Sequence, residues 1–317
     1  MRGAARRNDA SVGSTRTARA LCAARPPSMI CDMIRRFAIA RGTAVLAALV
    51  LAASCRRSDP PSQSPAADTV HIDGSNGVLP LVQALADAYR ADVPSAAIVL
   101  GGGLGSRARL EALVAGRIDV AVASHGLDSA ALARDGLEAH RIAITPVVIG
   151  VHAGVAVRGA SEAQVCDLLA GRLTSWAPLG GGTEGVHPHM RPESEVDTEV
   201  VRAGLPCMRD GEKTPGVTVV TVEETADMAR ALAETPGGVG VTTATVVEQS
   251  GGRIRALALD GVEPTAANVA DGRYRLTRAS YLVTRAPHSA AVASFLAYVR
   301  GENGARVLAA NGSVPAL

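Results

Sequence analysis

Two glycine-rich segments are the part of this chain best suited to hold a ligand. Residues 74–77 follow a β-rich run at 69–72, and residues 101–106 follow a second run at 97–100. Glycine lets backbone N–H groups approach a ligand closely, and a helix that begins there adds positive potential. The pattern favours a small anion as ligand. The alternative is that both turns only connect strands to helices.

Apolar residues at helical spacing follow the first turn and define the element behind it. Five of them share one helix face: Val78, Leu81, Val82, Leu85 and Tyr89. Pro80 is compatible with the first turn of such a helix. A third β-rich run at 119–123 completes a strand–helix–strand–helix–strand order, which predicts a parallel sheet with helices on both faces. Open sheets of this kind bind ligands at the carboxyl ends of their strands, where both glycine turns lie.

The alternation of strands and helices restarts in the second half of the chain. Ser161 with Gln164, and Thr221 with Glu224, have the spacing of capping boxes and predict helix starts. Residues 238–241 predict a strand that ends at a helix beginning at Thr242 or Thr243. The chain is therefore expected to be an α/β protein of two lobes, each a mixed sheet flanked by helices. Its 317 residues agree with two domains.

Charge and composition exclude several classes of function. The net charge is only +2, and eleven arginines precede residue 60, so the folded part is acidic and lacks a nucleic-acid footprint. Aromatic residues make up 2% of the chain, which argues against stacking of bases or sugars. Gly103, Gly105 and Ala108 imitate a dinucleotide fingerprint, but no acidic residue ends the next strand and no Gly-Lys-Ser/Thr follows.

Enzymatic chemistry has little support in the sequence. No nucleophile–His–Asp order, paired carboxylates or metal set stands near the glycine turns, so we expect no enzyme, cofactor or metal. His187 and His189 have the spacing of a strand-borne pair, but two ligands do not make a metal site. Cys166 and Cys207 either pair as a disulfide or are two buried small side chains. Trp176 is expected to be a packing anchor.

The start of the chain has the pattern of an export signal. Arginines precede an apolar run at residues 43–54, which is too short to span a bilayer and ends at Cys55. The segment 1–55 resembles a lipoprotein signal peptide with its lipidated cysteine at Cys55, although Ala52 replaces the usual Leu. A plain secretory signal or an N-terminal anchor is the alternative, and Met33 and Met29 are alternative starts. The Pro/Ser-rich stretch 56–67 predicts a flexible linker.

Seven segments of the chain, in order, resemble the phosphate-binding proteins of ABC importers. They are residues 73–81, 100–106, 119–125, 166–176, 236–240, 256–261 and 271–278. The resemblance runs from about Thr69 to the C-terminus. It implies a type II periplasmic-binding-protein fold with two chain crossings and a ligand cleft between the lobes. Lobe 1 would comprise residues 68–148 and 279–317, and lobe 2 residues 149–278.

The resemblance also implies a set of ligand-binding residues. They are Ser75, Asn76, Gly77, Gly105, Ser106, Ser124, His125, Arg191, Ser194 and Thr198. The chain departs from the family at Leu104, where a Ser is frequent, and at His125, where the best-known members have an Asp. Glu195 and Asp197 interrupt the family's Ser-Gly-Thr segment and would repel an anion unless they turn away or bind Arg191.

These expectations combine into one functional hypothesis. The protein is expected to be a monomeric, lipid-anchored solute-binding protein of the periplasm or outer cell surface, which captures phosphate or a similar oxyanion for an ABC permease in the membrane. The identity of the oxyanion stays open, because Leu104 and His125 alter the family's pocket. An oxyanion sensor or scavenger lipoprotein is the alternative, followed by a secreted phosphatase.

Overall fold

The computed structural model describes residues 69–124, 126–208 and 219–316. The predicted signal peptide, the lipidation of Cys55 and the linker at 56–67 lie outside the described residues. Among the helices that the structure describes, none combines the length and the apolar character that crossing a bilayer requires.

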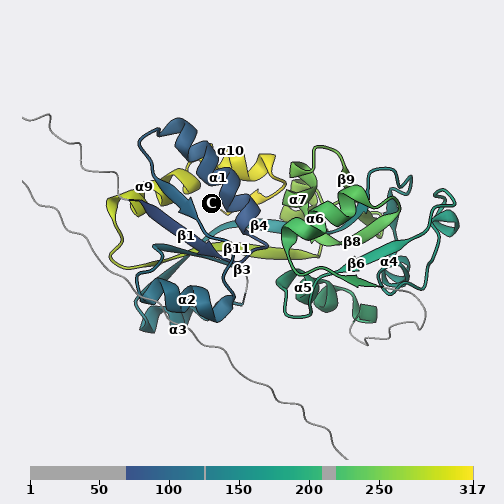
Figure 1. The fold of residues 1–317 in the computed structure, drawn as a ribbon, viewed down its shortest axis with the longest axis horizontal. Helices are drawn as coiled ribbons and strands as arrows, with labels where there is room; N and C mark the ends of the chain where they lie inside the picture. Colours follow the sequence, from purple (N-terminus) through teal and green to yellow (C-terminus); the bar gives the residue numbers. More distant parts are fainter. Residues whose placement is uncertain (1–68, 125, 209–218, 317) are drawn as a thin grey trace, which may run out of the picture. The chain divides into compact units, whose positions relative to one another are not determined.

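The first part of the described chain alternates strands and helices as predicted. In order it contains β1 (Val70–Gly74), α1 (Leu79–Asp92), β2 (Ile98–Leu100), α2 (Ser106–Val114), β3 (Val120–Ser124), α3 (Ser129–Arg134) and β4 (Leu137–His152). β1 pairs in parallel with both β2 and β3. The apolar face predicted for α1 is buried, and Pro80 lies in the first turn, where it costs no helical hydrogen bond. Helices α1 and α2 lie on opposite faces of this part of the sheet (Figure 1).

The elements that follow β4 build the second part of the structure. In order they are β5 (Gly159–Ala160), α4 (Glu162–Leu169), β6 (His187–Met190), α5 (Val196–Gly204), β7 (Val220–Thr221), α6 (Thr225–Glu234), β8 (Gly238–Thr243), α7 (Ala244–Gln249), β9 (Ile254–Ala256), β10 (Ala258–Leu259) and α8 (Ala266–Ala270). The chain then returns through β11 (Thr277–Arg285), α9 (Ala290–Arg300), α10 (Glu302–Ala310) and β12 (Val314–Pro315).

Local capping signals predicted some helix starts correctly and one incorrectly. Ser161 and Gln164 form the predicted capping box at the start of α4, and Thr243 caps α7. The capping box predicted at Thr221 is wrong, because Thr221 belongs to β7 and α6 begins at Thr225 with Glu224 as its N-cap residue. The strand pairing of Thr221 with Met190 in β6 overrides the local signal.

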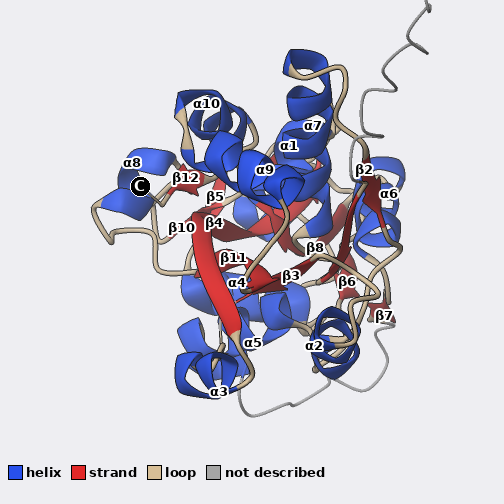
Figure 2. Ribbon diagram, turned by 90° about the vertical axis from the view of Figure 1, so that its left-hand side faces the viewer, coloured by secondary structure: helices blue, strands red, loops and turns tan. Residues whose placement is uncertain are grey.

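Two long strands connect the two parts of the sheet. The strand order is β2-β1-β3-β11-β4-β8-β6-β7, with β12 and β9 paired to β4. β4 pairs with β11 up to Pro146 and with β8 from Val147 onward. Strands and helices alternate through the structure, with helices on both sides of the strands (Figure 2). This is the mixed α/β sheet architecture that the sequence predicts.

The buried apolar side chains gather in separate clusters. One packs β1, β3, α1 and α9 around Phe295, and another packs the end of β4 with β8, α4 and α5 around Trp176. Trp176 is fully buried, donates from Nε1 to the Gly237 carbonyl oxygen at 3.0 Å, and is thus a packing anchor. We propose that these two clusters are the cores of the two lobes.

A disulfide joins α4 to the short 3-10 helix Pro206–Met208. Its two cysteines are Cys166 and Cys207, which are separated by 41 positions and have Cα atoms 6.2 Å apart. Cys166 is fully buried. Of the two alternatives that the sequence leaves open, the structure has the pair. A disulfide agrees with an oxidising compartment.

A buried histidine links β4, β11 and α9. His140 Nδ1 lies 2.7 Å from Arg300 Nη2 and its Nε2 lies 2.9 Å from Thr284 Oγ1. Because a guanidinium only donates, Nδ1 accepts and the ring proton sits on Nε2, so the imidazole is neutral. Burial lowers the pKa of His140; Arg300 and His288 lower it further, while Glu138 opposes them.

This histidine should make the fold sensitive to acid. A pKa that is lower in the folded than in the unfolded chain means that the unfolded chain binds the proton more readily, so His140 stabilises the fold fully above about pH 6.5 and progressively less below it. We expect the urea midpoint to fall between pH 7 and pH 5, and His140→Gln to flatten that fall. His189, whose pKa burial also lowers, leaves a residual slope. An unchanged slope in His140→Gln would contradict the assignment.

Candidate functional site

The two glycine turns lie against each other, and one carboxylate links them. Asp73 Oδ1 accepts from the Gly74 N–H at 2.6 Å and from the Gly103 N–H at 3.0 Å. The Leu104 N–H donates to the Gly74 carbonyl oxygen at 2.8 Å. Gly74 has a φ of +147°, and a Cβ atom there would overlap the Val122 carbonyl oxygen. Asp73, which the sequence reasoning did not single out, therefore positions both turns.

The backbone donors of the first turn divide into used and available groups. Ser75 donates its N–H to the Val122 carbonyl oxygen at 2.9 Å, so this predicted donor is engaged in the sheet. No hydrogen bond between described residues uses the N–H groups of Asn76 and Gly77. In the second turn, Gly105 is the N-cap residue of α2 and has no side-chain cap, which leaves the first N–H groups of that helix available. Gly105 and Ser106 are exposed.

Arg191 meets the first turn from the other part of the structure. It follows β6 directly, and its side chain is 2% exposed. Its Nη2 donates to Asn76 Oδ1 at 3.2 Å and lies 3.0 Å from Glu195 Oε2. Its Nη1 is buried and has no hydrogen-bond partner among the described residues. A buried guanidinium nitrogen without a partner is costly, and an anion would satisfy it.

The remaining predicted site residues have different positions. Thr198 is buried, but its hydroxyl donates to the Arg191 carbonyl oxygen at 3.2 Å and therefore positions the arginine. Ser124 is buried at the end of β3 and donates to the Ala279 carbonyl oxygen at 3.2 Å. Ser194 is exposed. His125 lies outside the described residues. Arg191 is thus hydrogen-bonded both to Asn76 and to Thr198.

A second buried arginine, Arg278 of β11, completes the junction. Its side chain is 3% exposed, and its Nη1 lies 2.8 Å from Asp197 Oδ1 of α5. Its Nη2 donates to the Gly77 carbonyl oxygen, and a Cβ atom on Gly77 would lie 2.6 Å from Nη1. Asp197 therefore binds Arg278, while Glu195 binds Arg191. The sequence indicated that Glu195 and Asp197 could bind a cation, but it did not select Arg278 as the partner of Asp197.

Two further buried basic side chains, Arg109 and His189, have a nitrogen without a hydrogen-bond partner among the described residues. Arg109 of α2 is 8% exposed, its Nε has no hydrogen-bond partner, and burial lowers its pKa. His189 is buried in β6 with an unpartnered Nδ1. Among the described residues, no group of three or more His, Cys, Asp or Glu side chains is arranged to hold a metal ion.

Comparison with known proteins assigns this chain to a protein family. A sequence profile of the PBP superfamily domain matches residues 59–303. The chain belongs to this family. The phosphate-binding protein PstS of Bacillus subtilis is 28% identical over 245 residues, which are 75% of this chain and 77% of that protein. The family has the type II periplasmic-binding-protein fold that the sequence resemblance implied.

Two solved structures share the fold at low sequence identity. A candidate phosphate ABC transporter substrate-binding protein from Clostridium perfringens, solved with bound phosphate, has a TM-score of 0.64 at 22% identity and covers 79% of this chain and 100% of its own. An ABC-type phosphate transport receptor from Vibrio cholerae has a TM-score of 0.53 at 21% identity and covers 77% and 99%. At these identities the likeness concerns the fold alone.

The pair of Arg278 and Asp197 should be essential for stability. Removing one partner of a buried ion pair leaves the other charge uncompensated, which costs about 3–5 kcal/mol. We expect Asp197→Asn to lower the free energy of unfolding in urea by about that amount. Asp271→Asn is the control, because it breaks the exposed pair with Arg273, whose side chains are both 61% exposed, and should cost below about 1 kcal/mol. Equal effects would contradict the prediction.

Proposed function

We propose that this protein captures an oxyanion, phosphate or a close analogue, between its two lobes and delivers it to an ABC importer. The observation that carries the proposal is the buried Arg191 Nη1, which has no hydrogen-bond partner, beside the available N–H groups of Asn76 and Gly77. A guanidinium fork and backbone N–H groups both suit a tetrahedral anion. Family membership and the similarity to the phosphate-binding protein of Bacillus subtilis support the same function.

The described residues around Arg191 are hydrogen-bond donors suited to binding an anion. Arg191 would bind two oxygens of the anion, and Asn76, Gly77, Gly105 and Ser106 would supply further donors. Ser75 contributes only its hydroxyl, because its N–H is engaged. We propose binding without turnover, and an exported, membrane-tethered location through Cys55, which agrees with a disulfide in the folded part. Release of a phenol from a chromogenic phosphate ester would instead revive the phosphatase alternative.

Calorimetric titration of the purified protein with phosphate tests the proposal. We expect saturable binding, with sulfate as the comparison anion. Arg191→Ala should weaken it by about 10–150-fold, the equivalent of about 1.5–3 kcal/mol for a charged hydrogen bond. Arg191→Lys retains the charge without the guanidinium fork, so its phosphate affinity should lie between those of the unchanged protein and Arg191→Ala. Arg230→Ala, at an arginine whose side chain is 63% exposed, is the control. A folded Arg191→Ala variant with unchanged affinity would refute the assignment.

Glu195 should act as an internal competitor for the anion. Its carboxylate already pairs with Arg191, and a like charge a few ångströms from a bound anion costs about 1–4 kcal/mol at a protein's effective dielectric. We expect Glu195→Gln to tighten phosphate binding at least about fivefold in the same titration. Glu193→Gln, two residues earlier and exposed, should leave the affinity within about twofold. Weaker binding in Glu195→Gln would show that the carboxylate assists the anion.

A further inference from the structure

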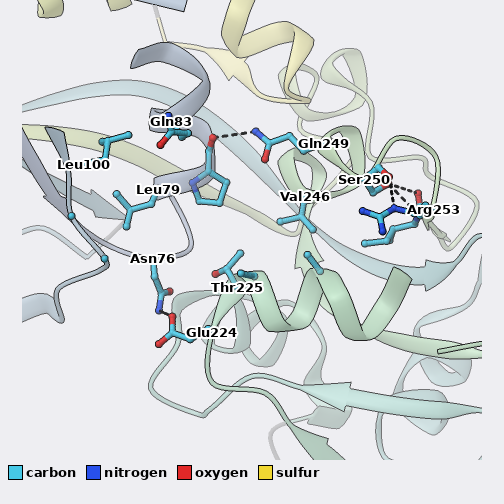
Figure 3. Close-up of a pocket in the computed structure, with 16 residues that line it drawn as sticks. Asn76, Leu79, Gln83, Leu100, Glu224, Thr225, Val246, Gln249, Ser250 and Arg253 are labelled. Carbon is cyan, nitrogen blue, oxygen red and sulfur yellow. Dashed lines mark hydrogen bonds between the residues drawn. The ribbon is translucent and has the colours of Figure 1, made fainter. Parts of the chain in front are cut away.

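A cavity that the predicted anion site does not include lies beside it. It is open to solvent and has a volume of about 440 Å³; the start of α1 and the loop after β2 line one side, and α6, α7 and the segment after α7 line the other (Figure 3). Of the predicted site residues, Asn76 is the one that lines it.

Asn76 makes the cavity continuous with the arginine. Its amide oxygen accepts from Arg191 Nη2 at 3.2 Å, and its amide nitrogen donates to Glu224 Oε2 at 2.8 Å. Glu224 lines the cavity, and Figure 3 shows the Asn76 and Glu224 side chains directed toward each other at its edge. Asn76 is therefore the residue that links the cavity to Arg191.

The size and lining of the cavity do not match a bare inorganic anion. Apolar side chains form much of its wall: Leu79, Pro80, Leu100, Val246 and Ile254. Cavities of about 300–1,000 Å³ with mostly apolar walls accommodate small organic molecules. A single tetrahedral ion would leave such a wall in contact with water. Polar side chains lie between the apolar ones, such as Gln249, whose Nε2 donates to the Pro80 carbonyl oxygen at 3.1 Å.

The lining also limits the kind of organic group. Among the described residues, no aromatic side chain lines the cavity, so a nucleobase or a sugar ring would lack the stacking surface that usually binds it. The wall combines an aliphatic patch with polar side chains that include the charged Glu224 and Arg253. A short aliphatic chain, with few polar atoms of its own, fits this lining best because it buries apolar surface against apolar surface.

We propose that the natural ligand is a short aliphatic organophosphate, with its phosphoryl group on Arg191 and its aliphatic group in this cavity. The proposal rests on the oxyanion-binding function above and specifies its ligand class. A phosphate monoester and a phosphonate present the same phosphoryl oxygens and differ in the atom that links phosphorus to carbon. The cavity wall contacts the carbon chain and selects for it.

Titration of the full chain with inorganic phosphate, propyl phosphate and propylphosphonate tests this proposal. We expect both alkyl compounds to bind at least about tenfold more tightly than inorganic phosphate, as two or more buried CH₂ groups allow. The ratio of the affinities for propyl phosphate and propylphosphonate shows whether the site prefers a phosphate monoester or a phosphonate. Equal or weaker binding of both alkyl compounds, with phosphate bound, would overturn this proposal and leave the oxyanion function intact. Binding of none of the three would refute both.

A filled-cavity variant separates the cavity from the anion site. Ala226 lines the cavity from an exposed position in α6, so Ala226→Phe should fill it without disturbing the core. We expect this variant to weaken propyl phosphate at least about tenfold while inorganic phosphate stays within about twofold. Ala133→Phe, the same change at an exposed position of α3, should change neither affinity. Unchanged propyl phosphate binding in folded Ala226→Phe would overturn the proposal.

Discussion

The buried guanidinium of Arg278 is the constraint on which the junction of this structure depends. A charge in a protein interior requires partners on every side, because water is excluded from it. Asp197 of α5 supplies the opposite charge, and the Gly77 carbonyl oxygen accepts from the other guanidinium nitrogen. One side chain of β11 thereby fixes a helix of the second part and a turn of the first part at the same place.

Arg191 differs from Arg278 in the hydrogen-bond partners of its terminal guanidinium nitrogens. Both arginines are almost fully buried, and each has a carboxylate beside it. Both terminal nitrogens of Arg278 have partners, a buried aspartate and a backbone carbonyl, and its Nε lacks one, whereas Arg191 keeps a terminal nitrogen, Nη1, without a partner among the described residues. Its neighbours hold the remainder of the group in place, through Thr198 on its backbone and Asn76 on its side chain. These contacts hold the guanidinium in one orientation.

The elements whose signals lie close together in the sequence could be predicted from it. The apolar face of α1 and the capping box of α4 depend on residues three or four positions apart, and both are present in the structure. Thr221 shows the limit of such signals. It has the residue spacing of a helix cap, but pairing with β6 places it in a strand. A contact across the sheet outweighed a local preference of the order of 1 kcal/mol.

For the site, the sequence by itself determined the fold class, the glycine turns, and the resemblance that selected Asn76, Gly77 and Arg191. Only the tertiary structure decided which groups are free and which are engaged. It showed that the Ser75 N–H and the Thr198 hydroxyl are used internally, and that Asp73 and Arg278 position the turns. The physical reason is that these hydrogen bonds, except the one from Thr198, which spans seven positions, join residues 30 to 201 positions apart in the chain. Spacing along a sequence carries no information about such pairs, since folding alone brings them together.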